Sequence, residues 1–182
     1  LGVAVLLYLC ATSWADAKVK LPALISDGMV LQREQSVKVW GTADAGENIT
    51  IEFQKKSYHA TADANGQWSI TLPPLKAGGP FLMQINDIKL NDILVGDVWL
   101  CSGQSNMELP VKRVMDMFSN EILNYNNEKI RHILIPQKYN FHAPQEEISA
   151  TSWKTLTQKN VMEFSALAYF FAKEMSKRLV YL

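Results

Sequence analysis

Apolar and polar residues alternate along much of the first half of the chain, and this pattern predicts β-strands. The alternating apolar positions are Val37, Val39, Ile49, Ile51, Phe53, Trp68, Ile70 and Leu72. Strands that recur at such short spacing predict an antiparallel β-sandwich over residues 18–95, with an immunoglobulin-like or jelly-roll-like topology. Residues 63–66, Asp-Ala-Asn-Gly, lie between two of these runs and predict a tight hairpin turn, because Asn-Gly tolerates positive φ.

The pattern changes at Gly96, where the predicted sandwich has ended. Residues 98–101 form a continuous apolar run, which predicts a strand that is covered on both faces. Residues 115–123 predict a helix, residues 130–135 a strand and residues 163–179 a long helix. The apolar face expected for the long helix consists of Phe164, Leu167, Ala168, Phe171, Ala172, Met175 and Leu179. This order of elements predicts the start of an α/β domain over residues 96–182.

Ser105 lies in a polar turn directly after the predicted buried strand. In open α/β sheets, ligands bind just beyond the carboxyl ends of the strands. A serine at this place can present its hydroxyl to a substrate while its backbone N–H points at a developing oxyanion. Gly103 is expected to relieve crowding in the turn, and Gln104 and Asn106 to hold the loop by hydrogen bonds or to contact acetyl or sugar hydroxyl groups. The alternative for Ser105 is a simple turn former or helix N-cap.

Residues 99–107, which end in Gly-Gln-Ser-Asn-Met, resemble the nucleophile block of the SGNH-type carbohydrate esterases. Within that group the block most resembles the sialate O-acetylesterases, with the acetyl xylan esterases as near relatives. Further stretches that resemble the sialate O-acetylesterases are residues 25–33, 39–41, 65–68, 76–80 and 164–174. The resemblance therefore covers most of the chain after residue 20.

The resemblance implies a fold and a reaction. The fold is an N-terminal β-sandwich followed by an SGNH-hydrolase α/β domain of the flavodoxin-like, three-layer kind. The reaction is removal of O-acetyl groups from sialic acids through an acetyl-enzyme on Ser105, so the expected partner is an O-acetylated sugar. The alternatives are an esterase that deacetylates xylan or another glycan, and a glycan-binding module without catalysis. No cofactor or metal is implied, because no cluster of His, Cys or carboxylate residues has the spacing of a ligand set.

The catalytic base is not evident among the histidines. In the SGNH families it belongs to an Asp-x-x-His block near the C-terminus, and none of His59, His132 and His142 has an aspartate three positions earlier. The family's other oxyanion donors also come from later blocks. We therefore expect the catalytic His and Asp to be absent from this chain, and the chain alone to be inactive on acetyl esters. His59 is expected on a strand surface, and His142 lies in a loop that could line a sugar pocket.

The two ends of the chain suggest processing and truncation. Residues 1–9 are almost wholly apolar and are followed by Ala15-Asp16-Ala17, which resembles a signal peptide over residues 1–17 that lacks its start. We therefore expect export, to a periplasm, the cell exterior or a lysosomal lumen. The apolar run is shorter than the ~20 residues of a membrane span. Because the predicted long helix ends with the chain, we expect an N-terminal part of a larger enzyme.

Composition narrows the possible partners. The 18 basic and 18 acidic residues balance, without a basic stripe, which argues against nucleic acid as a partner. Cys10 and Cys101 are the two cysteines, and loss of the leader would leave no internal disulfide. Cys101 is expected to be a small buried apolar residue. Core packing is likewise expected of the tryptophans on strand patterns, which are Trp40, Trp68 and Trp99. The oligomeric state is left open.

Overall fold

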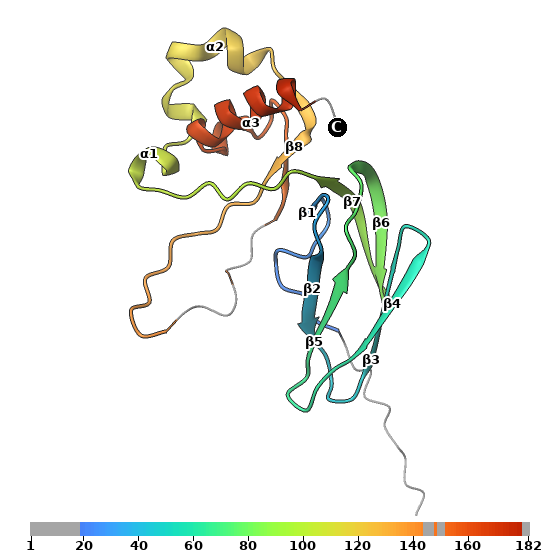
Figure 1. The fold of residues 1–182 in the computed structure, drawn as a ribbon. Helices are drawn as coiled ribbons and strands as arrows, with labels where there is room; N and C mark the ends of the chain where they lie inside the picture. Colours follow the sequence, from blue (N-terminus) through green and yellow to red (C-terminus); the bar gives the residue numbers. More distant parts are fainter. Residues whose placement is uncertain (1–18, 144–147, 149–151, 180–182) are drawn as a thin grey trace, which may run out of the picture.

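The computed structural model describes residues 19–143, 148 and 152–179, so the predicted leader lies outside the described residues. A β-rich part comes first and a smaller part with helices follows (Figure 1). The strands of the β-rich part are β1 (Val30–Gln32), β2 (Val37–Thr42), β3 (Asn48–Phe53), β4 (Lys56–Thr61), β5 (Gln67–Leu72), β6 (Gly78–Ile85) and β7 (Ile88–Gly96). The later elements are α1 (Ser105–Glu108), the 3-10 turn η1 (Val111–Arg113), α2 (Met115–Leu123), β8 (Asn127–His132), β9 (Lys154–Leu156), the 3-10 turn η2 (Val161–Glu163) and α3 (Ala166–Arg178).

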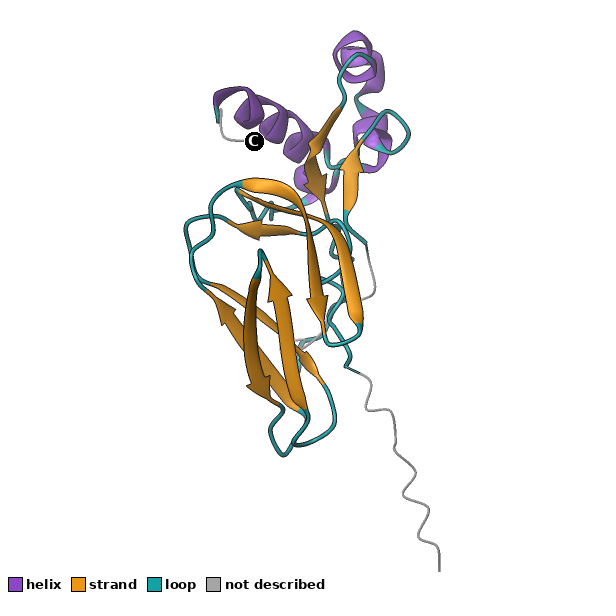
Figure 2. Cartoon of the chain, turned by 90° about the vertical axis from the view of Figure 1, so that its right-hand side faces the viewer, coloured by secondary structure: helices purple, strands orange, loops and turns teal. Residues whose placement is uncertain are grey.

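The seven strands of the β-rich part form a five-stranded sheet in the order β1-β7-β6-β3-β4 and the separate pair β2-β5. The larger sheet curls, and the β2-β5 pair lies beside it (Figure 2). Every pairing is antiparallel except that of β1 with β7, which is parallel. The predicted all-antiparallel sandwich is thus confirmed only in part. Only strands joined by a tight turn must run antiparallel. β1 and β7 are separated by five other strands, so they can pair in parallel.

The alternating positions supply the core of the β-rich part, as the sequence pattern predicts. All of them are buried except Val37, which packs against the core while partly exposed. They share one cluster with Met83, Ile85, Ile93 and Val95 from β6 and β7. Burial of a large aliphatic side chain contributes about 1.5–3 kcal/mol, so this shared face is the main source of stability for the β-rich part.

The turn at residues 63–66 is present, but it does not join two paired strands. Asp63 Oδ1 accepts from the backbone N–H groups of Asn65 (2.8 Å) and Gln67 (2.9 Å). The turn leads from β4 in the larger sheet to β5 in the smaller one, so the predicted hairpin is wrong. A two-residue hairpin occurs instead between β3 and β4, where Gln54 and Lys55 take φ values of 49° and 63°. Neither residue type signals such a turn.

The apolar run at residues 98–101 is not a strand, contrary to prediction. β7 ends at Gly96, and the Val98 N–H then donates to Gln32 Oε1 at 2.9 Å. Leu100 is 88% exposed and Cys101 is exposed, so neither is the buried residue that the sequence suggested. A buried strand needs neighbours that satisfy its backbone, and the described residues place none beside this run. The division into domains at residue 95 remains a prediction.

Two of the predicted tryptophan placements hold and one does not. Trp68 is buried, and Trp40 packs partly exposed against the same core. Trp99 is 56% exposed, and its ring meets that of Phe171 edge to face, with centroids 5.2 Å apart. Trp99 belongs to the unpaired run after β7, which explains why it lies outside the core.

The two later helices match the predicted segments, but α3 buries a different face. α2 occupies residues 115–123 as predicted, and α3 falls within residues 163–179. The buried residues of α3 are Ala166, Tyr169 and Lys173, whereas Leu167 and Phe171 from the expected apolar face are exposed. Lys173 can be buried because its Nζ lies 2.8 Å from Glu121 Oε1 and 4.8 Å from the centre of the Tyr125 ring. Because a charged lysine occupies one position of the buried face, the pattern of apolar residues does not identify that face. Among the described residues, no helix is long and apolar enough to cross a membrane.

Arg131 and Trp153 attach the β8-β9 pair to the β-rich part. The Arg131 side chain is only 4% exposed, and its guanidinium donates to the carbonyls of Gly28 and Asp92 and to Asp92 Oδ1. Trp153 Nε1 donates to the Leu24 carbonyl at 3.0 Å. The strand predicted at residues 130–135 lies instead at residues 127–132, because its pairing with β9 ends at His132.

His132 connects β8 to the beginning of α3. Its ring stacks on Phe164 with centroids 3.6 Å apart and an angle of 12° between the planes. Burial lowers the pKa of His132 from 6.5 to about 4, with a further lowering from Lys154 and an opposing effect of Glu163. The imidazole is therefore neutral in the folded protein near pH 7.

Replacing Arg131 by Met should lower the free energy of unfolding by about 2–3 kcal/mol, because two carbonyls and a carboxylate lose a buried donor. Urea unfolding followed by tryptophan fluorescence measures the change. Arg178→Met is the matched control, since Arg178 pairs with Glu174 on the exposed side of α3 and should be nearly neutral. Equal losses in the two variants would contradict the role given to Arg131.

Acid should destabilise the protein through His132. The folded-state pKa is lowered, so between about pH 6.5 and about pH 4 the unfolded chain binds a proton that the folded protein does not. Stability should fall with pH in this window by less than ~1.4 kcal/mol per pH unit, because the ring keeps some contact with water. His132→Phe should keep the stack and lose part of this pH dependence in urea titrations. His59→Phe, at an exposed position, is the control. Parallel pH profiles of wild type and His132→Phe would refute the assignment.

Candidate active site around Ser105

Ser105 is the first residue of α1, a single helical turn at the end of the long segment that leaves β7 (Figure 1). The Met107 N–H donates to the Gln104 carbonyl at 2.9 Å and the Leu109 N–H to the Ser105 carbonyl at 3.0 Å, which closes the turn. Ser105 is exposed, and none of the described residues accepts a hydrogen bond from its backbone N–H. The first N–H groups of a helix have no partner within it, so this one can bind an oxyanion.

Backbone hydrogen bonds hold the Ser105 turn against the start of α3. The Ala166 N–H donates to the Leu109 carbonyl and the Val111 N–H to the Phe164 carbonyl, both at 2.8 Å. Ser165 Oγ lies 3.7 Å from Met107 Sδ and also accepts from the Ala168 N–H at 3.3 Å as the N-cap of α3. The buried Phe164 anchors this junction in a second small core. The serine is therefore exposed, but the turn that carries it has fixed neighbours.

The three loop residues predicted to support Ser105 have different surroundings. A Cβ atom on Gly103 would lie 3.3 Å from Met107 Cβ, so the turn is crowded at this glycine. The side chains of Gln104 and Asn106 are exposed and make no hydrogen bond to any described residue. They are therefore available to a ligand. Their roles, and that of Ser105, remain predictions.

No histidine hydrogen-bonds to Ser105 within the described part of the chain. His59 is exposed on β4, as expected, and its Nδ1 lies 3.2 Å from Thr50 Oγ1. His132 is held in the stack on Phe164. His142 is exposed in the loop after β8, where its backbone N–H donates to Asn140 Oδ1 at 3.0 Å. The expectation that the catalytic His and Asp are absent from this chain stays a prediction.

Glu108 is a neighbour of Ser105 that the sequence pattern does not single out. It ends α1, and its Oε2 accepts from Gln137 Nε2 at 3.3 Å. Gln137 Oε1 in turn accepts from the Tyr139 hydroxyl at 3.3 Å. The Glu108–Gln137 contact joins residues 29 positions apart, so no local sequence signal could have predicted it.

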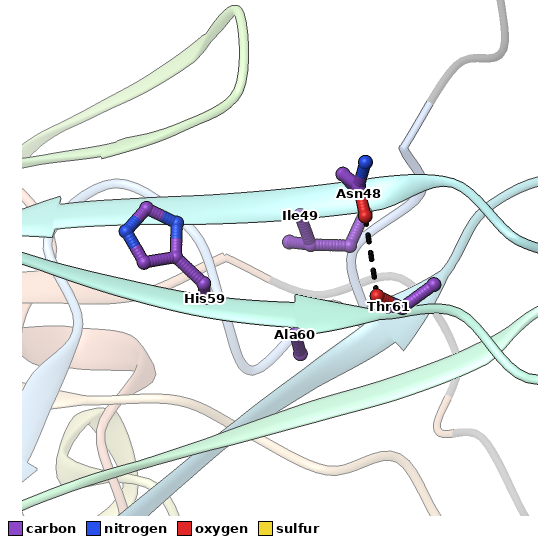
Figure 3. Close-up of a pocket in the computed structure, with 5 residues that line it drawn as sticks. All are labelled: Asn48, Ile49, His59, Ala60 and Thr61. Atoms are coloured by element: carbon purple, nitrogen blue, oxygen red, sulfur yellow. Dashed lines mark hydrogen bonds between the residues drawn. The ribbon is translucent and has the colours of Figure 1, made fainter.

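A broad depression lies elsewhere, on the β3-β4 hairpin (Figure 3). It has a volume of about 450 Å³ and is lined by Asn48, Ile49, His59, Ala60 and Thr61. Thr61 Oγ1 donates to Asn48 Oδ1 at 3.1 Å along its edge. This lining holds no carboxylate to orient His59, and the Thr61 hydroxyl donates to Asn48, so the depression lacks the arrangement of a hydrolytic site.

Comparison with known proteins finds similar sequences and a similar solved structure. No family model matches the chain. Sialate O-acetylesterase from Homo sapiens is 28% identical over 203 aligned positions, which cover the whole chain and 39% of that protein. Sialate O-acetylesterase from Mus musculus is 30% identical over 130 positions, which cover 63% of the chain and 24% of that protein.

A solved structure also matches. The crystal structure of a carbohydrate acetylesterase from Xanthomonas citri superposes with a TM-score of 0.83 at 37% identity and covers 89% of this chain and 38% of that one. The chain thus spans about two fifths of the length of its human and Xanthomonas relatives. The resemblance indicated by residues 99–107 and the N-terminal motifs is confirmed, and the chain is a relative of the sialate O-acetylesterases.

Proposed function

We propose that the protein is a serine esterase that removes O-acetyl groups from carbohydrates, with Ser105 as its nucleophile. The observation that carries this proposal is the exposed Ser105 at the start of α1, with a backbone N–H that no described residue uses. The names of the relatives, which are sialate O-acetylesterase and carbohydrate acetylesterase, support the reaction class.

In this proposal Ser105 Oγ attacks the acetyl carbonyl carbon and transfers its proton to a base other than the three histidines of the chain. The Ser105 N–H donates to the oxyanion of the tetrahedral intermediate. As the intermediate collapses, the base returns the proton from Ser105 Oγ to the leaving sugar oxygen, and the sugar departs as an alcohol. The acetyl-enzyme that remains is hydrolysed by water to acetate and free Ser105. Loss of one oxyanion donor typically costs about a hundredfold or more in rate, so a single N–H is only part of the hole.

Sialic acid is the proposed sugar, because the curated relatives that match the chain act on O-acetyl sialate by name. Xylan or another glycan is the second candidate. It is favoured by the higher identity, 37%, to the bacterial protein that is described only as a carbohydrate acetylesterase. A glycan-binding module without catalysis is the third. Export is also proposed, from the apolar run and Ala-x-Ala motif before residue 18.

Replacing Ser105 by Ala should abolish acetate release, with a loss of about a thousandfold or more, because the nucleophile is removed. The assay uses protein expressed from the complete coding sequence, with O-acetylated sialic acid and acetylated xylo-oligosaccharides as substrates. Ser102→Ala, an exposed serine in the same segment, is the matched control and should retain activity. Undiminished turnover by Ser105→Ala would overturn the proposal.

The same assay tests whether the 182 residues suffice. Without a base hydrogen-bonded to Ser105, we expect residues 1–182 alone to release no acetate. Turnover by these residues that Ser105→Ala removes would show that one of the three histidines serves as the base after all. Saturable sugar binding without turnover by the complete protein would favour the binding-module alternative.

A further inference from the structure

The loop after β8 carries two aromatic rings that the rest of the described chain leaves uncovered. Tyr139 is 81% exposed and Phe141 is 91% exposed. Their ring centroids are 6.3 Å apart and the planes differ by 22°, so the two rings are nearly parallel. Single exposed apolar residues are common, but two parallel aromatic rings at neighbouring loop positions form a surface that water solvates poorly.

The loop is tied to the turn that carries Ser105. The Tyr139 hydroxyl donates to Gln137 Oε1, and Gln137 Nε2 donates to Glu108 Oε2, each at 3.3 Å. Glu108 lies one helical turn after Ser105 in α1. In Figure 1 this loop, in orange, leaves β8 and descends below α1. The rings are therefore positioned relative to the candidate nucleophile by side-chain contacts, and not by chain connectivity alone.

The ring surfaces suit a sugar better than a polar or charged ligand. The face of an aromatic ring is electronegative and attracts the slightly positive C–H groups that line one side of a pyranose. The high exposure of Tyr139 and Phe141 leaves their ring surfaces open to a ligand. The other exposed aromatic pair near the site, Trp99 and Phe171, meets edge to face, so part of the Phe171 or Trp99 face is already covered.

We propose that Tyr139 and Phe141 form a carbohydrate platform that binds the sugar ring of the acetylated substrate while its acetyl group reaches Ser105. This inference rests on the proposed esterase function and adds the residues that bind the sugar. Gln137 and Glu108 are positioning residues, since they act on the platform through Tyr139. The platform contributes to binding in the ground state and the transition state alike, so it lowers KM and leaves kcat nearly unchanged.

The first test is steady-state kinetics on protein expressed from the complete coding sequence. Tyr139→Ala with Phe141→Ala should raise KM for the acetylated sugar roughly tenfold and change kcat less than about twofold. Phe141→Leu keeps apolar bulk without a ring and should also raise KM. Tyr139→Phe keeps the ring but loses the hydroxyl bond to Gln137, so it should raise KM, but less than Tyr139→Ala does. Leu82→Ala, at an exposed apolar position on β6, is the control and should have wild-type constants.

The second test does not need activity. With Ser105→Ala protein, NMR of the methyl glycoside of O-acetylated N-acetylneuraminic acid and of O-acetylated xylobiose should show upfield ring-current shifts of sugar-ring protons. These shifts should vanish in the Tyr139→Ala, Phe141→Ala background. Unchanged KM in the double variant, or sugar shifts that survive it, would overturn the platform while leaving Ser105 chemistry intact. An inactive wild-type protein would overturn the esterase function, and the NMR result would then decide the platform by itself.

Discussion

A buried guanidinium, together with the Trp153 indole, fixes the β8-β9 pair against the β-rich part of the chain. Arg131 leaves β8 and donates to the Gly28 carbonyl, to the Asp92 carbonyl and to the Asp92 carboxylate. A guanidinium is planar and cannot lose its charge, so it holds three acceptors in one fixed geometry. β8 is paired with β9 and stacks through His132 on Phe164, and Phe164 accepts the backbone bond that fixes the segment after α1. The contacts of Arg131 therefore help to set the position of Ser105 relative to the β-rich part.

Local patterns predict the parts of the fold that short-range physics determines. Alternation identifies the buried faces of β2, β3 and β5, since a period of two is a property of each strand alone. Helical spacing identifies α2 and the span of α3. Sequence patterns do not predict two other features. These are the parallel pairing of β1 with β7 and the β3-β4 turn at Gln54 and Lys55. The first depends on partners distant in sequence, and the second uses residue types that rarely adopt positive φ.

In the candidate site, too, features set by contiguous residues can be predicted from the sequence, and contacts between distant residues cannot. The motif around Ser105 is contiguous, so it can be recognised from the sequence, whereas the contact of Glu108 with Gln137 joins separate segments. The prediction for residues 98–101 fails for a related reason. An apolar run indicates that side chains avoid water, but a strand forms only where neighbouring backbone is available. The buried Lys173 is the reverse case, because its pairing with Glu121 lets a charged residue occupy a core position.

The exposure of Cys101 has a practical consequence for studying the protein. Its thiol is free and lies four residues before Ser105, outside both cores. Cys101 is also the single cysteine of residues 11–182. A fluorophore or spin label attached at Cys101 would therefore report the movement and solvation of the segment that leads into the serine turn. Such a label would make substrate encounter observable in real time, without altering a residue of the turn itself.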